Sequence, residues 1–215
     1  VFVDDVPEFT QRARNKGMIT TTVNTAEVGL KDNFLLNELL TGEWRSQVRD
    51  KMGFPKKALV FGMGRVGRAH LGYYLAYLNG FSVTFVDKHQ ERIDELNKRR
   101  AYDLKKGDEY LKISSVEAVH LDDQEAIIRT GLESNLIFTA VGPTKIHSTI
   151  PLIAAIIEAR FRQDRQDPLH IIFAENFSFE QSEISDFRMA LERALVRPEL
   201  ISYAQNKLAL VSTII

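Results

Sequence analysis

After residue 57, short runs of consecutive apolar residues alternate with longer segments in which apolar residues recur at helical spacing. The apolar runs lack polar residues at alternate positions, which is typical of strands covered on both faces of a parallel sheet. They predict strands at residues 58–61, 81–86, 135–141 and 169–176, and helices near residues 65–79, 91–99, 122–130, 145–162 and 179–195. This alternation predicts an α/β fold with a doubly wound, mostly parallel sheet.

Three details extend this expectation. Leu71, Leu75 and Leu78 share one face of the first helix, which we expect to end at Gly80. Residues 102–120 contain short alternating pieces, which predict further strands joined through a turn at residues 106–108. The last eight residues, LALVSTII, predict a strand that we interpret as cut off before its continuation in a longer protein.

Residues 1–57 follow a different pattern, and we expect an N-terminal extension of unassigned role ahead of a domain at residues 58–215. The β-branched stretch at residues 18–24 predicts a strand. Residues 33–52 carry one helical stripe of apolar residues, which Gly42 interrupts. Pro55 and the two lysines after it mark the expected boundary.

Composition excludes several classes of function. The formal net charge of -1 gives no basic field for nucleic acid, and no apolar run is long enough to span a bilayer. The chain has no cysteine, which removes disulfides and thiolate metal sites and suits a reducing, cytoplasmic location. Its five histidines show no ligand spacing, and no G-x-S-x-G motif is present. We therefore expect no metal site and no hydrolase nucleophile.

The sequence GMGRVG lies where the first predicted strand gives way to a helix. Its six residues fit the G-x-G-x-x-G spacing of a dinucleotide-binding loop: Gly62, Met63, Gly64, Arg65, Val66 and Gly67. The first glycine would permit a tight turn, the second would let a pyrophosphate approach the backbone, and the third would let the helix pack closely. The N–H groups and partial positive charge at the start of the helix would favour phosphate.

An acidic residue completes the pattern. Asp87 ends the next predicted strand, 20 residues after Gly67, where a carboxylate would accept hydrogen bonds from the ribose hydroxyls. A 2′-phosphate would meet that carboxylate as a like charge, so the sequence favours NAD over NADP, and the nearby Lys88 and Arg92 weaken this preference without reversing it. The alternative interpretations are a glycine-rich turn that binds nothing and solvated rather than phosphate-binding side chains at Arg65 and Arg68.

Two further strand ends face the same edge of the predicted sheet. Small residues follow the strand at 135–141, and we expect four residues to line the central part of the cofactor: Thr139, Ala140, Val141 and Gly142. Asn176 follows the strand at 169–176 and would hold the nicotinamide carboxamide or a substrate oxygen, or else cap a turn. Its neighbour Glu175 is expected to be a surface or ion-paired residue.

Four blocks, in this order and spacing, carry a resemblance: KALVFGMGRVGRAHLG, VTFVDKHQERIDELN, IFTAVGP and HIIFAENF. Together they resemble the polyol-specific long-chain dehydrogenases, the family that includes mannitol-1-phosphate 5-dehydrogenase, mannitol 2-dehydrogenase and the hexuronate reductases. The resemblance covers about residues 57–215. It implies a Rossmann domain and the NAD-dependent interconversion of a sugar-alcohol phosphate and a ketose phosphate, such as mannitol 1-phosphate and fructose 6-phosphate.

The resemblance also implies what this chain lacks. The family uses a lysine base in a K-x5-N-x2-H motif within a helical C-terminal domain, and no lysine of this chain has that spacing. We therefore expect no catalytic residue here, with Asn176 as a contact to the substrate or the nicotinamide, and a polyol or polyol phosphate bound through the missing domain. Hydride transfer needs a base for the hydroxyl proton, so the chain alone is expected to be inactive.

A regulatory nucleotide-sensing module, like those that gate potassium transport, is the rival interpretation. Such modules share the strand, the GMGRVG-type loop and the acid, and they need no base. The TAVGP and AENF blocks and the C-terminal strand count against this class. A Rossmann dehydrogenase acting on a sugar acid is a third possibility that shares the same cofactor half.

Overall fold

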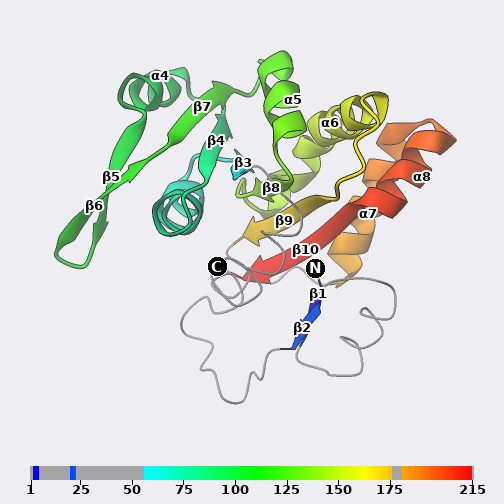
Figure 1. The fold of residues 1–215 in the computed structure, drawn as a ribbon, viewed down its shortest axis with the longest axis horizontal. Helices are drawn as coiled ribbons and strands as arrows, with labels where there is room; N and C mark the ends of the chain where they lie inside the picture. Colours follow the sequence, from blue (N-terminus) through cyan, green and yellow to red (C-terminus); the bar gives the residue numbers. More distant parts are fainter. Residues whose placement is uncertain (1, 5–19, 23–55, 176–180, 215) are drawn as a thin grey trace. The chain divides into compact units, whose positions relative to one another are not determined.

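The computed structural model describes residues 2–4, 20–22, 56–175 and 181–214 (Figure 1). The chain divides into two compact units, Val1–Lys51 and Met52–Ile215. In the first unit, β1 (Phe2–Asp4), which the pattern did not predict, pairs in parallel with β2 (Thr20–Thr22). The helix predicted at residues 33–52 lies outside the described residues.

The second unit is built on a six-stranded parallel sheet. Its strands, in chain order, are β3 (Lys57–Phe61), β4 (Ser82–Asp87), β7 (Val116–His120), β8 (Leu136–Thr139), β9 (Leu169–Glu175) and β10 (Leu208–Ile214). Their order across the sheet is β10-β9-β8-β3-β4-β7. The chain thus moves outward from β3 in one direction, returns to β8 beside β3, and continues in the other direction. This is the strand order of a Rossmann fold, and it confirms the predicted fold class.

The crossovers between these strands are mainly helical. They contain η1 (Val66–Leu78), α4 (Gln90–Arg99), α5 (Gln124–Glu133), η2 (Pro143–Thr149), α6 (Ile150–Arg162), α7 (Gln181–Leu195) and α8 (Pro198–Lys207). Between α4 and β7 an antiparallel hairpin is inserted, formed by β5 (Ala101–Lys106) and β6 (Glu109–Ser114). In the part of the chain that the structure describes, no helix combines the length and apolar character needed to cross a membrane.

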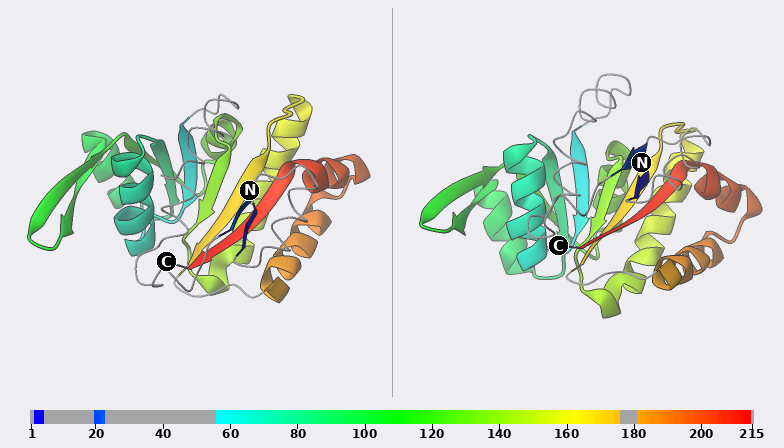
Figure 2. Two further views of the ribbon diagram at one scale, coloured as in Figure 1. Left: turned by 60° about the horizontal axis from the view of Figure 1, so that its bottom comes forward. Right: turned by 90° about the horizontal axis from the view of Figure 1, so that it is seen from below.

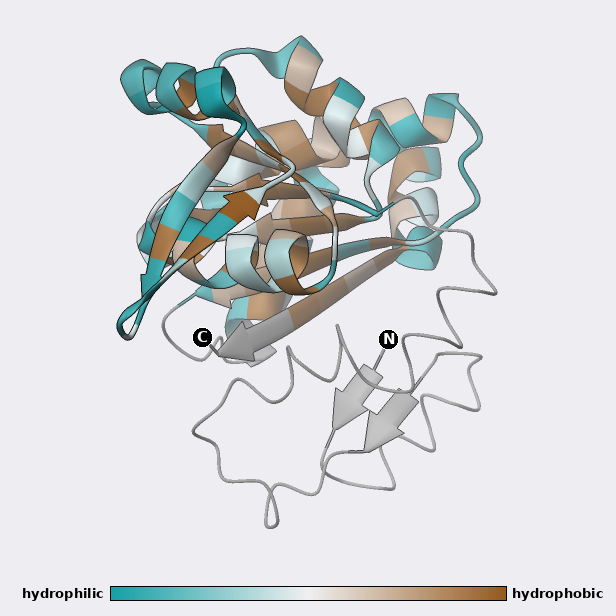
Figure 3. Cartoon of the chain, turned by 60° about the vertical axis from the view of Figure 1, so that its left-hand side comes forward, coloured by the Kyte–Doolittle hydropathy of each residue, from teal (hydrophilic) through white to brown (hydrophobic). Residues whose placement is uncertain are grey.

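Helices cover both faces of the sheet (Figure 2). Leu59 and Phe61 of β3 belong to an apolar cluster that also contains residues of α5, α6, α7 and α8. Alternate residues of a strand face opposite sides, and Val60 is equally buried on the other face, beside its register partner Phe85, which lies against η1 at Gly67 and Gly72. The hydropathy colouring of Figure 3 shows apolar strands inside and polar residues along the outer sides of the helices. The continuous apolar runs of the sequence therefore reflect burial on two faces.

Helix η1 differs from the predicted α-helix because it has the wider π winding. The hydroxyl of Tyr102, on β5, donates a hydrogen bond to the backbone carbonyl of Arg68 at 2.6 Å. A Cβ at Gly72 would overlap that hydroxyl, so the glycine makes room for it. A side chain inserted beside the helical hydrogen bonds is a known cause of altered winding. Leu71 and Leu75 are buried as predicted, whereas Leu78 is 38% exposed, because the wider winding turns it away from their face.

Two prolines explain the other differences. The amphipathic stretch predicted as one helix at 145–162 is divided into η2 and α6, and Pro151 stands in the first turn of α6. Pro198, which the pattern placed after the last helix, begins α8, a helix that the pattern missed. Proline favours the first turn of a helix because it has no N–H to satisfy there.

Arg160 on α6 is fully buried and links the segments that precede β8 and β9, at the amino ends of these strands. Its guanidinium donates to the backbone carbonyl of Ser134 at 3.2 Å and to the carboxylate of Asp167 at 2.8 Å. Arg165 donates to the same carboxylate and to the carbonyl of Leu132. Burial alone would raise the pKa of Asp167, but the hydrogen bonds from Arg165 and Arg160 outweigh it and hold that pKa well below its usual range.

Replacing Asp167 by alanine should lower the free energy of unfolding by on the order of 3 kcal/mol, because it leaves Arg160 buried without a counter-charge. The matched control is Asp103→Ala, which removes an exposed ion pair with Arg99 and should cost less than about 0.5 kcal/mol. Urea unfolding followed by circular dichroism measures both values. Equal losses in the two variants would show that the buried network does not stabilise the fold.

Candidate functional site

The loops that follow β3 and β8 meet at the point where the chain reverses its direction across the sheet. The N–H of Gly62 donates to the carbonyl of Val86 at 2.8 Å, and the N–H of Ala140 donates to the carbonyl of Phe61 at 2.7 Å. Gly62 has a φ of +104°, and a Cβ there would collide with the carbonyl of Ala140. Only glycine fits this position, because both the conformation and the contact exclude a side chain.

The other two glycines of the motif differ in their surroundings. A Cβ at Gly67 would overlap the carbonyl oxygen of Gly62, so the start of η1 packs directly on the backbone of the loop. A Cβ at Gly64 would meet no atom of the described part of the chain within 4 Å. Gly64 therefore lies on the open side of the loop, next to the exposed Arg65 and the half-buried Val66. The residue Arg65 at the start of η1 makes no side-chain capping hydrogen bond.

Asp87, at the end of β4, holds the glycine loop. One of its carboxylate oxygens accepts a hydrogen bond from the N–H of Met63 at 3.0 Å, and the other accepts from the N–H of His89 at 3.0 Å. Asp87 is half-buried, whereas Lys88 and Arg92 are exposed beside it. The predicted acid thus lies against the predicted loop, with an additional role in fixing the backbone of Met63.

Glu175, at the end of β9, makes a similar arrangement on the other side. Its two carboxylate oxygens accept hydrogen bonds from the N–H of Val141 at 3.1 Å and from the N–H of Gly142 at 2.9 Å. Glu175 is 3% exposed, so the expectation of a surface residue was wrong. The sequence contained only a weak signal for this role, an acid ending a buried strand beside a strand that ends in glycine.

Burial raises the pKa of Glu175, and the hydrogen bonds from Gly142 and Val141 oppose this shift without cancelling it. The ionised form of a carboxylate is disfavoured when it leaves water, and backbone N–H donors compensate only in part. Gly142 itself has a φ of +89°, and no atom of the residues that the structure describes lies within 4 Å of a Cβ built on it. The loop after β8 therefore turns between a buried carboxylate on its inner side and open space on its outer side.

The structure thus brings together nearly all the predicted site residues. Met63 and Thr139 are buried, so their side chains do not face solvent. Ala140, Val141 and Gly142 are half-buried. Arg68 is exposed on η1, and its carbonyl is occupied by Tyr102. Asn176 lies outside the described residues, and its predicted contact stays a prediction.

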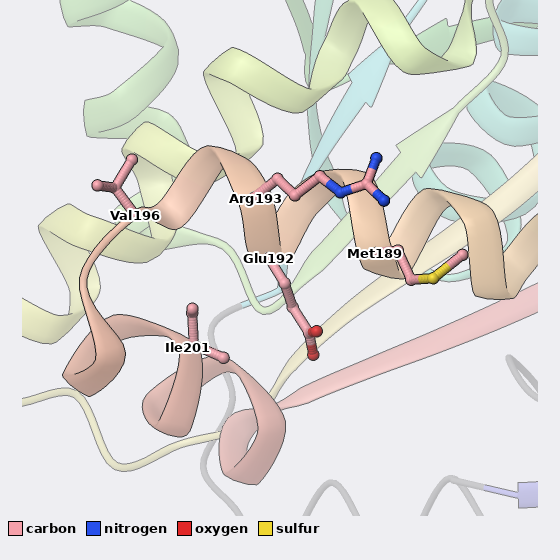
Figure 4. Close-up of a pocket in the computed structure, with 5 residues that line it drawn as sticks. All are labelled: Met189, Glu192, Arg193, Val196 and Ile201. Carbon is pink, nitrogen blue, oxygen red and sulfur yellow. The ribbon is translucent and has the colours of Figure 1, made fainter.

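Other features of the described residues do not belong to this site. A hollow between α7 and α8 is lined by Met189, Glu192, Arg193, Val196 and Ile201 (Figure 4), none of which belongs to the loops after β3, β4 or β8. Among the residues that the structure describes, no three acidic or histidine side chains are grouped to hold a metal ion. His170 lies in β9 at the opposite end from Glu175, and burial together with the charge of Arg160 lowers its pKa to about 4.

The strand order and the two loops after β3 and β8 define a Rossmann domain, a class of fold in which ligands bind at the carboxyl ends of the strands. Residues 56–215 match the model of the mannitol dehydrogenase Rossmann domain, and the chain belongs to this family. The family predicted from the sequence motifs is thereby confirmed.

Individual relatives agree with this assignment. The mannitol-1-phosphate 5-dehydrogenase of Streptococcus mutans is 38% identical over 125 residues, which are 56% of this chain and 32% of that protein. The enzyme of the same name from Lactococcus lactis is 36% identical over 141 residues, 61% of this chain and 36% of that protein. The chain therefore spans about a third of the length of these curated relatives.

Among solved structures, the ternary complex of Pseudomonas fluorescens mannitol 2-dehydrogenase with NAD and D-mannitol is similar in fold. The match has a TM-score of 0.55 at 18% sequence identity and covers 73% of this chain and 40% of that one.

Two glycine substitutions test the packing of the loop. Gly67→Ala should lower the free energy of unfolding by about 1–3 kcal/mol, because its Cβ must displace the backbone at Gly62. Gly64→Ala should leave stability unchanged or slightly raise it, since the added methyl meets open space. Thermal unfolding of the two variants beside the wild type gives the comparison. Equal stability of Gly67→Ala and the wild type would contradict the close packing of η1 on the loop.

Proposed function

We propose that the unit Met52–Ile215 binds NAD at the glycine loop and serves as the cofactor-binding part of an NAD-dependent oxidoreductase. The reaction is the interconversion of a sugar-alcohol phosphate and a ketose phosphate. The observation that carries the proposal is the open space at Gly64 in a loop that is otherwise closely packed against backbone. Gly62 and Gly67 are required by the fold itself, whereas nothing within the described fold requires a glycine at position 64.

The residues present fit a dinucleotide. Gly64 lets a pyrophosphate reach the main chain at the start of η1, where the helix offers N–H groups and a partial positive charge. Arg65 is exposed at the same point and adds a positive charge. Asp87 is positioned at the neighbouring strand end to accept hydrogen bonds from the adenosine ribose. Ala140, Val141 and Gly142 form the next part of the same edge and would line the cofactor on its way to the nicotinamide.

The same geometry supports NAD over NADP. The carboxylate of Asp87 carries a negative charge at the ribose position, and a 2′-phosphate would be repelled by it. Lys88 and Arg92 are exposed beside Asp87 and offer a partial counter-charge. Because Asp87 is held in place by the N–H groups of Met63 and His89, it cannot simply turn away from a 2′-phosphate.

The substrate class rests on the relatives, whose names specify mannitol 1-phosphate as the alcohol. Bound NAD supplies the hydride acceptor, and the protein must add a base that removes the hydroxyl proton. No lysine of this chain has the K-x5-N-x2-H spacing that the resemblance implies for that base. We therefore expect this chain to bind the cofactor without turning over a polyol phosphate. A location in the cytoplasm is part of the same proposal.

The regulatory nucleotide-sensing module remains the second candidate, because its requirements at the glycine loop are identical. Membership of the mannitol dehydrogenase family favours the oxidoreductase. The ligand distinguishes the two: a sensor that binds ATP as tightly as NADH would favour the regulatory class, and a marked preference for NADH favours the dehydrogenase.

Calorimetric titration with NADH, NADPH and ATP tests the proposal directly. The wild-type chain should bind NADH more tightly than NADPH, and Gly64→Ala should weaken NADH binding by at least about tenfold, or roughly 1.4 kcal/mol, without loss of stability. A suitable control is Gly107→Ala at the tip of the β5–β6 hairpin, where φ is +62°; it strains the backbone but should leave NADH binding unchanged. Wild-type protein that gives no heat with NADH would refute the proposed function.

A further inference from the structure

Two carboxylates, one in each half of the sheet, accept hydrogen bonds from the loops that follow β3 and β8. Asp87 ends β4 and accepts from the N–H of Met63, in the loop that follows the neighbouring strand β3. Glu175 ends β9 and accepts from the N–H groups of Val141 and Gly142, in the loop that follows the neighbouring strand β8. Since β3 and β8 lie side by side at the centre of the sheet, the two acids occupy equivalent places in its two halves.

From this correspondence we infer that Glu175 is a positioning residue for the cofactor: its carboxylate fixes the loop at residues 140–142, which lies beside the glycine loop at the carboxyl ends of the strands. The inference rests on the proposed function. It assigns to Glu175 a role toward the loop backbone, separate from any contact made by the adjacent Asn176.

The contacts of the 140–142 loop explain how Glu175 affects the glycine loop, which it does not touch through its two backbone hydrogen bonds. Because the N–H groups of Val141 and Gly142 are turned inward to Glu175, the direction of these two peptide groups is set by the carboxylate. The carbonyl of Ala140, immediately before them, lies against Gly62 so closely that no Cβ would fit between the two. A displacement of the 140–142 loop would therefore also disturb the packing of Gly62 in the glycine loop.

Stability alone does not favour a carboxylate at this place. Glu175 is 3% exposed, and its carboxylate accepts hydrogen bonds from the neutral backbone N–H groups of Val141 and Gly142. A buried anion with such partners gains less than it loses by leaving water, as its raised pKa indicates. The carboxylate provides two acceptor oxygens, which lie 3.1 and 2.9 Å from the backbone nitrogens of Val141 and Gly142. Together these two hydrogen bonds fix the orientation of the turn.

The test combines hydrogen exchange of individual amides with calorimetric NADH titration of the 215-residue chain. In Glu175→Ala, the amides of Val141 and Gly142 should exchange at least about tenfold faster, and NADH should bind roughly tenfold more weakly. Glu175→Gln keeps one acceptor oxygen, so one of the two amides should stay protected and the NADH affinity should lie between those of the wild type and Glu175→Ala. This graded rescue is not expected from a general loss of stability.

Asp123→Ala is the matched control, because Asp123 also accepts a backbone N–H, that of Ala126 at the start of α5. It should speed exchange at the start of α5 and leave both the 140–142 amides and the NADH affinity unchanged. Unchanged exchange of the two amides in Glu175→Ala would overturn the inference, and so would faster exchange with unchanged NADH affinity. If Glu175→Ala does not fold, the loss of one protected amide in Glu175→Gln decides the same point.

The outcomes separate this inference from the function on which it rests. Wild-type protein that binds no NADH would refute the proposed function and the cofactor role of Glu175 together. Normal NADH binding by wild type and Glu175→Ala alike would refute only the role of Glu175.

Discussion

The candidate site of this domain depends on direct contact between main-chain segments at the carboxyl ends of β3 and β8. The start of η1 rests on the carbonyl of Gly62, and Gly62 in turn lies against the carbonyl of Ala140. Side chains are excluded at both Gly62 and Gly67, so the strand, the loop and the helix approach as closely as backbone allows. This packing brings the start of η1 to the edge of the sheet, where its N–H groups can meet a phosphate.

Two acids then determine which backbone donors remain available. The N–H of Met63 is taken by Asp87, and those of Val141 and Gly142 are taken by Glu175. In the proposed complex the donors for the pyrophosphate therefore come from residues 64–67 at the start of η1, and the loop after β8 serves as a wall rather than an anion site. A division of this kind places the negative ligand at the helix start and keeps the buried carboxylate of Glu175 away from the phosphates.

The sequence pattern predicted the strands and helices whose apolar spacing is visible within the element itself. It failed where the conformation or burial of a residue depends on a contact with another element. The apolar runs identified the central strands because both faces of each are buried. The exposure of Leu78 could not be foreseen, since the winding of η1 is linked to Tyr102, which lies on another element. The burial of Arg160 carried no signal in the pattern, since only the fold brings Asp167 to it. The glycines and Asp87 were found because their spacing is itself the signal, whereas Glu175 has meaning only when β8 lies beside β9.

The geometry defines the cofactor more sharply than the substrate, and the reason is physical. A dinucleotide is recognised by backbone and by one carboxylate, all of which this chain contains. A polyol phosphate must be oriented against the nicotinamide by side chains that also supply a proton acceptor. The chain spans about a third of the length of its relatives, and the K-x5-N-x2-H spacing is absent from it. In the proposed function this chain therefore binds the cofactor without turnover, because hydride transfer also needs a base beside the nicotinamide.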